Sequence, residues 1–241
     1  MERGYIISNM TFLLIIPLIL LLSAVFSFIN MENSIILNKK SSKNVIYTVD
    51  DIKNNVPIIA RKVIEDMAYN VIDNNVSYTN SSDSAKKIIE SKINEISKKY
   101  ENKGIKSNCI INYLKTNSND PFLIDINFSL DVEEGNVKHQ ETITKEFSIE
   151  GLPDPLPFIK LRKYGNLHHD KSKIYYGDSL AAYLSEKGLK NVSYYKNAIS
   201  PFLIKKCPYE EYTTHNNTNI LLNCLKNGYY HESHDGACYF Y

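Results

Sequence analysis

The stretch TFLLIIPLILLLSAVFSFI, from Thr11 to Ile29, contains no charged side chain and decides how the rest of the chain is interpreted. A helix rises about 1.5 Å per residue, so about 20 apolar residues cross the ~30 Å hydrocarbon core of a bilayer. Pro17 lies inside the run, and membrane helices tolerate a kink at such a proline. The sequence therefore predicts an N-terminal transmembrane helix in a membrane anchor over residues 1–31, with the lipid bilayer as its partner.

A secretory signal peptide is the alternative for this segment. Signal peptides have apolar cores of about 7–15 residues and small residues at the cleavage site. The run is longer than that and ends in Val25-Phe26-Ser27-Phe28, which is a poor cleavage site. A retained helix is the preferred interpretation.

The basic residues on the two sides of the span give conflicting information about orientation. Arg3 precedes the span, whereas Lys39, Lys40 and Lys43 follow it, and a local count would place the C-terminal part inside the cell. Large domains cross membranes largely regardless of their charge, and only about ten residues precede the span. We therefore expect a single-pass protein of the cell membrane with its C-terminal part outside the cytoplasm.

Composition and charge exclude several classes of function. Charged residues make up 23% of the 241-residue chain and the net charge is +1, so there is no basic field for nucleic acid and no acidic, disordered tail. About 200 residues follow the span, enough for one or two domains with a hydrophobic core. We expect a folded part on an anchor, without a nucleic-acid partner.

Two amphipathic helices are predicted after a polar linker over residues 32–47. The first ends near Asn74, and the second begins at Ser82 or Asp83 and ends at Gly104, a residue that accepts the left-handed conformation. Apolar residues spaced by three and four define both helices: Ile52, Val56, Ile59, Val63, Ile64, Met67, Val71 and Ile72 in the first, and Ala85, Ile89, Ile93, Ile96 and Tyr100 in the second.

After Gly104 the apolar residues recur at every second position, which is typical of strands with one buried face. Ile124, Ile126, Phe128, Leu130 and Val132 alternate with polar residues in one strand. A hairpin turn at Glu133–Asn136 leads into a partner strand over residues 137–149, and Cys109–Leu114 is a third strand. We therefore predict an α+β domain over residues 48–150, with both amphipathic helices packed on a three-stranded antiparallel sheet.

A small, irregular, cysteine-containing C-terminal module is predicted over residues 161–241. The proline-rich stretch GLPDPLPF, which begins at Gly151, is expected to be a stiff extended linker over residues 151–160. Expected elements in the module are strands at 174–176 and 192–195 and helices at 178–186 and 219–226. Cys207, Cys224 and Cys238 lie in this part and Cys109 in the first, so we expect at least one disulfide within the module, with the partners left open.

Histidines and cysteines also make this module the best candidate for metal chemistry. Zinc prefers the imidazole and thiolate ligands found at Cys207, His215, Cys224, His231, His234 and Cys238. Their spacing lacks a close cysteine pair and a helical His-Glu-x-x-His motif. A solvated tyrosine-rich loop held by a disulfide is preferred over a zinc site, and His168-His169-Asp170 is expected to be an exposed charged loop. We assign no metal, no cofactor and no catalytic residue.

The residues that precede the apolar run carry a resemblance to a known family. Glu2-Arg3-Gly4 resembles the short charged leader of type IV pilin-like precursors of archaea and bacteria, which a membrane peptidase cuts at the glycine. Counted from Tyr5, the fifth residue is Asn9, where pilins usually carry a glutamate. The segments GLPDPLPF, KKCPYEEY and NGYYHESHDGAC resemble uncharacterised membrane-anchored proteins of methanogenic archaea, a resemblance that implies no activity.

One enzyme motif is present in part. The segment Ile174–Leu180, IYYGDSL, resembles the first block of GDSL esterases, which would make Ser179 a nucleophile at the start of a helix. The family's Gly-x-Asn-Asp block and its final Asp-x-x-His are absent from the sequence. Asp178 and Ser179 also suit a helix cap, which explains the match without catalysis.

The sequence thus predicts a membrane-anchored extracytoplasmic protein that is not an enzyme. Its role is expected to be structural or interactive at the cell surface, in a pilin-like manner, with other surface proteins or further copies of itself as partners. A zinc-dependent or GDSL-type hydrolase displayed outside the membrane is the alternative.

Overall fold

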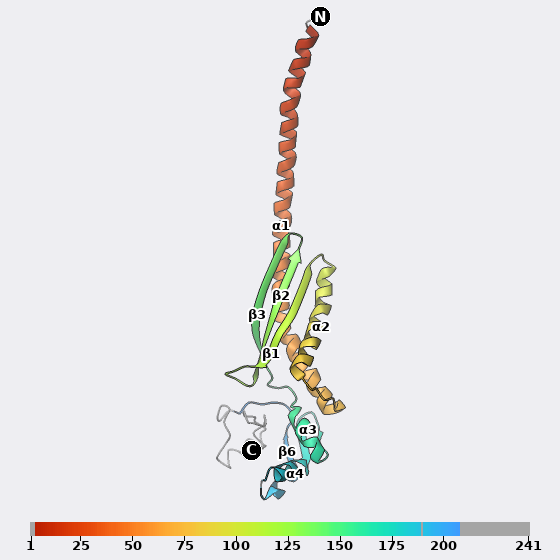
Figure 1. Cartoon of the computed structure of the whole chain (residues 1–241), viewed down its shortest axis with the longest axis vertical. Helices are drawn as coiled ribbons and strands as arrows, with labels where there is room; N and C mark the ends of the chain where they lie inside the picture. The colour runs from red at the N-terminus through yellow and green to blue at the C-terminus, as the bar shows by residue number, and fades with distance from the viewer. Residues whose placement is uncertain (1–2, 189, 208–241) are drawn as a thin grey trace.

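The computed structural model describes the backbone of residues 3–188 and 190–207, and side chains from residue 15 onward except at 189 and 194. The molecule is elongated, with one long helix, a sheet and a second helix against its C-terminal half, and a smaller lobe at the far end (Figure 1). The chain is α+β, with a long apolar N-terminal helix and a three-stranded antiparallel sheet, as predicted.

Helix α1 spans Arg3–Asn74 without interruption, so its 72 residues are about 108 Å long. Residues 32–47, expected to be a polar linker, belong to this helix, and that expectation was wrong. The segment contains neither glycine nor proline. A helix that is already formed on both sides extends through such residues at little cost, because only nucleation is unfavourable.

The C-terminal half of α1 and helix α2 (Ser81–Glu101) share a core with the sheet. This core lies in the first lobe, which comprises residues 45–150. Helix α2 contacts strand β1, and α1 contacts β2 and β3 (Figure 1). Core residues that are exposed by 2% or less include Ile52, Val56, Ala60 and Val63 of α1, Ala85, Ile89 and Ile93 of α2, and Ile126, Phe128, Leu130 and Val132 of β2. They follow the helical and strand periods of the sequence.

The sheet contains β1 (Lys106–Thr116), β2 (Leu123–Glu134) and β3 (Val137–Ser148), in the order β1-β2-β3. The predicted hairpin at Glu133–Asn136 is confirmed, and Gly135 takes the positive φ of 59° that the turn requires. The pairing of β1 with β2 shifts between Ile111 and Tyr113. Helix α2 begins one or two residues earlier than predicted, because the side chain of Asn80 accepts a hydrogen bond from the backbone N–H of Asp83.

The second lobe comprises residues 151–207. It contains helix α3 (Leu156–Leu161), the 3-10 turn η1 (Arg162–Tyr164), strand β4 (His168–His169), strand β5 (Lys173–Gly177), helix α4 (Ser179–Glu186), the 3-10 turn η2 (Val192–Tyr195) and strand β6 (Ala198–Pro201). The strands form a second antiparallel sheet in the order β4-β5-β6. The strand predicted at 174–176 and the helix predicted at 178–186 are found as β5 and α4. The strand predicted at 192–195 is wrong, because that segment is the turn η2.

Residues 151–160 are folded rather than an extended linker. The N–H of Gly151 donates to the carbonyl oxygen of Ile204, the N–H of Ile204 donates to Leu152, and the N–H of Asp154 donates to Phe202. Leu152 and Phe158 are each 2% exposed. The segment has a core to join, in which Phe158 packs with Ile72 at the end of α1.

Candidate functional site

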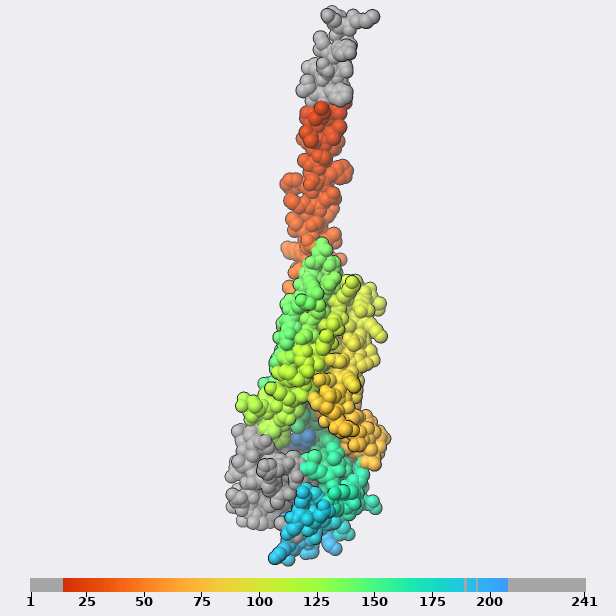
Figure 2. All heavy atoms as spheres, in the orientation of Figure 1, coloured from red at the N-terminus to blue at the C-terminus, as the bar shows by residue number. Residues whose placement is uncertain are grey.

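The N-terminal half of α1 exposes apolar side chains to an extent that a water-soluble surface does not explain. Fifteen large apolar residues between Ile15 and Leu37 are each 45–69% exposed. Soluble proteins rarely expose a contiguous apolar patch of more than a few hundred Å². The described part of the chain contains one helix that is long and apolar enough to cross a membrane, and none of its most apolar window is buried. Figure 2 shows these side chains standing clear of the lobes.

The junction between this exposed segment and the first lobe is made by polar contacts. Asn44 donates to the carboxylate of Glu134 at 3.1 Å, which ties α1 to the β2–β3 hairpin. Lys53 Nζ lies 3.1 Å from a carboxylate oxygen of Glu141 on β3. Because Val45 and Val49 are already buried in the core, the helix passes from full exposure to full packing within about two turns.

Arg61 of α1 holds the far end of β3. Its Nε donates to the carbonyl oxygen of Ser148 at 3.0 Å, and its Nη2 donates to that of Glu150 at 2.7 Å. Hydrogen bonds from a charged donor are stronger than those between neutral groups. These two bonds fix the chain where the first lobe passes into the second.

A groove of about 770 Å³ lies between the two lobes. Its walls are mainly apolar and come from α1, β2, α3 and the segment 149–155, while polar side chains line parts of it, among them Asn75, Asp154, Arg162 and Lys163. Pockets of about 300–1,000 Å³ with apolar walls and a few polar groups are typical of small-ligand sites. The groove can therefore hold an apolar group whose polar end meets these side chains.

Arg162 binds the C-terminal end of α1 from the second lobe. Its guanidinium donates to the carbonyl oxygens of Val71 at 3.2 Å and Ile72 at 2.7 Å, and to the side-chain oxygen of Asn75. The last carbonyl groups of a helix have no partner within the helix and carry partial negative charge, so a cation there is favourable. This contact fixes the second lobe on the end of α1.

His169 makes a second contact at the same helix end. Its Nε2 lies 2.9 Å from Oδ1 of Asp73, and its ring stacks on Phe202 with a centroid distance of 4.5 Å. The neighbouring His168 stacks on Tyr175 at 4.7 Å. The segment His168-His169-Asp170 was expected to be an exposed loop. His168 and Asp170 are exposed, but the two histidines form β4 and His169 is half-buried.

Asp170 organises the turn after β4. Its carboxylate accepts hydrogen bonds from the Ser172 hydroxyl, the backbone N–H groups of Ser172 and Lys173, and the Tyr175 hydroxyl. These bonds, those of Ser172 foremost, hold the pKa of the Asp170 carboxyl well below its usual range. The same bond to Asp170 raises the pKa of Tyr175. The Asp170 carboxylate therefore fixes the conformation of this turn, and its oxygens already accept hydrogen bonds from within the turn.

Ser179 is not arranged as an exposed nucleophile. Its side chain is fully buried, and its hydroxyl donates to the carbonyl oxygen of Tyr176 at 2.5 Å. A nucleophilic serine needs a base within hydrogen-bond distance of its hydroxyl. This geometry gives Ser179 a structural role at the start of α4 and weighs against the GDSL-type alternative.

The residues that were weighed as zinc ligands lie mostly outside the described part of the chain. Of that set the structure describes only Cys207, which is buried. Cys224 and Cys238, which the predicted disulfide within the module also involves as candidates, and the helix predicted at 219–226 lie outside the described residues. Among residues 3–188 and 190–207, no three His, Cys, Asp or Glu side chains are grouped so that they could hold a metal ion. Cys109 carries a free thiol in the first core, and burial raises its pKa to about 12.

Sequence reasoning did not find the groove or the contacts of Arg162 and His169, because they depend on how the two lobes meet. The exposed apolar segment, in contrast, was evident from composition alone. The chain matches no known family profile, and no curated protein or solved structure is significantly similar to it.

Proposed function

We propose that this chain is a single-span membrane protein whose two lobes lie outside the cytoplasm and serve a structural or interaction role at the cell surface. One observation carries the proposal: the fifteen large apolar side chains between Ile15 and Leu37 are exposed on a helix that stands clear of the folded part. Lipid is the solvent that makes such a surface favourable.

The continuity of α1 supports a structural role. The same helix that would cross the bilayer supplies core residues such as Ile52 and Val56 to the first lobe. A segment without a flexible linker holds the lobes at a defined distance and direction from the membrane surface. Such an arrangement suits a protein that presents surfaces to neighbours, either other surface proteins or further copies of this chain.

The proposed orientation in the membrane is based on the size of the folded part. The lobes and the residues after them make up most of the chain, and large domains are translocated largely regardless of their charge. Protease digestion of intact cells tests this orientation. We expect the lobes to be degraded without permeabilisation, and protection of residues 45–207 in intact cells would contradict it.

The pilin-like part of the proposal rests on the leader Glu2-Arg3-Gly4. Mapping the mature N-terminus by mass spectrometry tests it. A start at Tyr5 supports processing in the manner of pilin precursors. A start at Met1 supports a plain signal anchor and removes the pilin-like interpretation, while leaving the membrane anchor in place.

A further inference from the structure

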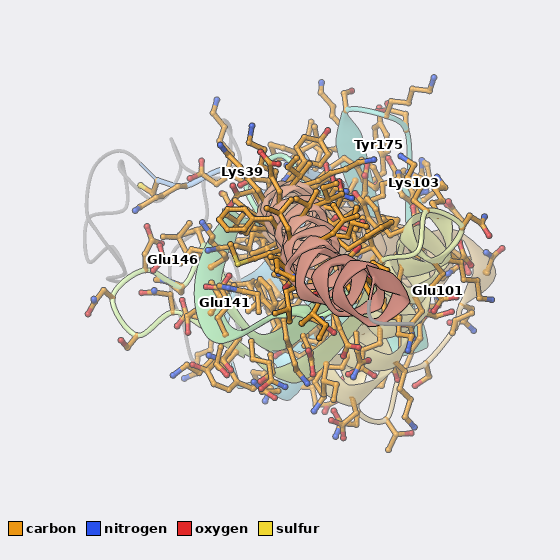
Figure 3. The ribbon with its side chains drawn as sticks, turned by 90° about the horizontal axis from the view of Figure 1, so that it is seen from above. Lys39, Glu101, Lys103, Glu141, Glu146 and Tyr175 are labelled. Carbon is orange, nitrogen blue, oxygen red and sulfur yellow. The ribbon has the colours of Figure 1, made fainter. Side chains whose placement is uncertain are left out.

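Seven exposed lysines gather at the end of the first lobe that faces the apolar segment of α1. We call them the lysine collar: Lys39, Lys40 and Lys43 of α1, Lys98 and Lys99 in the last turn of α2, and Lys103 and Lys106 around the start of β1. Seen from the N-terminal end of α1, Lys39 and Lys103 spread in different directions around the helix (Figure 3). The collar therefore extends over more than one side of α1 where the helix leaves the lobe.

Strand pairing and a contact between α1 and the β2–β3 hairpin bring the lysines of the collar together. Lys106 is paired with Glu133 next to the β2–β3 hairpin, and Asn44 of α1 contacts Glu134 of the same hairpin. The C-terminal end of α2 and this hairpin both lie at the end of the lobe nearest the protruding helix (Figure 1). Lysines from three separate elements thus share one end of the molecule.

The charge of the collar is not neutralised within the described residues. None of the seven lysines forms an ion pair there, in contrast to Lys138 nearby, whose Nζ lies 3.0 Å from Asp131. The acidic side chains at this end include Glu101, Glu133 and Glu134, and Glu134 already accepts a hydrogen bond from Asn44. The collar is therefore a local excess of positive charge, although the whole chain has a net charge of only +1.

The collar lies at the height of a membrane surface. If the hydrocarbon core ends near Met31, a headgroup layer of about 5–8 Å covers about the next one to one and a half turns of the helix, as far as Ile36. Lys39 then emerges at the outer edge of the headgroups, and Asn44 lies about 8 Å further along the axis. That distance is about one Debye length at physiological ionic strength, so the collar is within reach of charges on the lipid.

We propose that the lysine collar binds the anionic headgroups of the leaflet from which α1 emerges, and that this holds the first lobe against the membrane in a fixed orientation. The proposal rests on the membrane anchor proposed above, because only the anchor brings the collar to the surface. Basic segments next to a membrane helix are attracted to anionic lipids in this way.

Lysine reactivity in lipid nanodiscs tests the proposal. The full chain is placed in zwitterionic discs and in discs with about 30% anionic lipid, and the acetylation rate of each lysine is measured by mass spectrometry. We expect the rates at Lys98, Lys99, Lys103 and Lys106 to fall about threefold or more in the anionic discs at low salt, and to recover in about 1 M salt. Lys171 in the second lobe should react equally in both.

A pair of variants separates a local effect from one of total charge. The variant K98Q/K99Q/K103Q/K106Q removes four collar charges, and K171Q/K173Q/K187Q/K190Q removes four from the second lobe. Hydrogen exchange at the hairpin amides of Gly135 and Asn136 reports the approach of the lobe to the membrane. We expect anionic lipid to slow this exchange in the wild type and in the second-lobe variant, and to have no effect in the collar variant.

The outcomes distinguish the two proposals. A chain that fails to enter discs of either composition contradicts the anchor. A chain that inserts in both, with equal lysine rates and equal exchange, overturns the collar proposal and leaves the anchor standing. Protection of the collar by soluble dextran sulfate without any effect of lipid would also overturn it, because the collar would then bind soluble polyanions.

Discussion

Arg162 shows how one side chain joins two parts of a fold. It lies in the second lobe, yet its guanidinium binds the carbonyl oxygens of Val71 and Ile72 at the end of α1. Nothing in the local sequence around Arg162 indicates this role. The partners lie about 90 residues earlier, and a lysine or arginine after a short helix is usually interpreted as a solvated side chain.

Replacing Arg162 by alanine should lower the free energy of unfolding by about 2 kcal/mol, because hydrogen bonds from a charged group are lost and partly buried carbonyl oxygens are left without partners. Denaturant titration of the detergent-solubilised protein, followed by circular dichroism, measures this change. Lys163→Ala is the matched control, since Lys163 is exposed and its ammonium lies over the ring of the adjacent Tyr164, and it should change stability by less than about 0.5 kcal/mol. Equal effects of the two changes would refute the role assigned to Arg162.

The carboxyl group of Glu141 makes the stability of the fold depend on pH. Burial acts to raise the pKa of its carboxyl, but hydrogen bonds from Lys53 and His139 outweigh burial, and the net result is a pKa lowered from the ordinary 4.5. A carboxyl with a lowered pKa in the folded state stabilises the fold above its unfolded pKa, and this contribution is lost as the pH falls through the folded value. We expect stability to fall below about pH 4.5, and to fall less steeply in Glu141→Gln. Parallel pH profiles for the two proteins would contradict this account.

At the scale of the elements, α2 closes one edge of the sheet. Three side chains, four residues apart on one face of α2, reach the outer edge of β1: Ser82 donates to the carbonyl oxygen of Leu114, Lys86 to that of Asn112, and Glu90 accepts from the N–H of Ile111 at 2.9 Å. An open strand edge is a template for pairing with another chain. These contacts therefore protect β1.

Replacing Glu90 by alanine should leave the N–H of Ile111 without its partner, at a cost of about 1–2 kcal/mol, and should increase aggregation on heating. Thermal unfolding with light scattering measures both effects. Glu95 lies on an exposed part of the same helix, so Glu95→Ala serves as the control and should behave like the wild type. A Glu90→Ala protein that stays monomeric and equally stable would show that the contact is dispensable.

The elements that could be predicted are those whose signal is local. The alternation of Ile124 to Val132 indicated β2, and the spacing of Ile52 to Ile72 indicated the packed half of α1. The polar residues 32–47 were misjudged because polarity reports solvent exposure, whereas helix continuation depends on the absence of a breaking residue. The turn at 192–195 was misjudged because Val-Ser-Tyr-Tyr favours a strand by propensity, and tertiary context overrode it. The groove between the lobes depends on contacts distant in sequence and had no local signal.

At the scale of the whole molecule, the proposed membrane anchor depends on the apolar half of α1. Replacing Leu20 and Leu22 by lysine should reduce membrane insertion strongly, because each lysine near the centre of a span costs about 3 kcal/mol. The carbonate-resistant membrane fraction measures this loss. Ile58 is 65% exposed in the first lobe, so Ile58→Lys adds a charge to α1 outside the span and should leave the fraction unchanged. A double variant that remains fully in the membrane would contradict the anchor.

Because α1 is unbroken, the angle that it would make with the bilayer normal as a membrane anchor would be passed on to everything attached to it. From Leu37 to Asn74 the helix extends about 55 Å beyond the proposed span. Membrane helices tilt by about 20° on average, and such a tilt would displace the distal lobe sideways by about 19 Å. Local bilayer thickness, which governs tilt, would thus set how far each molecule leans and which neighbours fall within its reach.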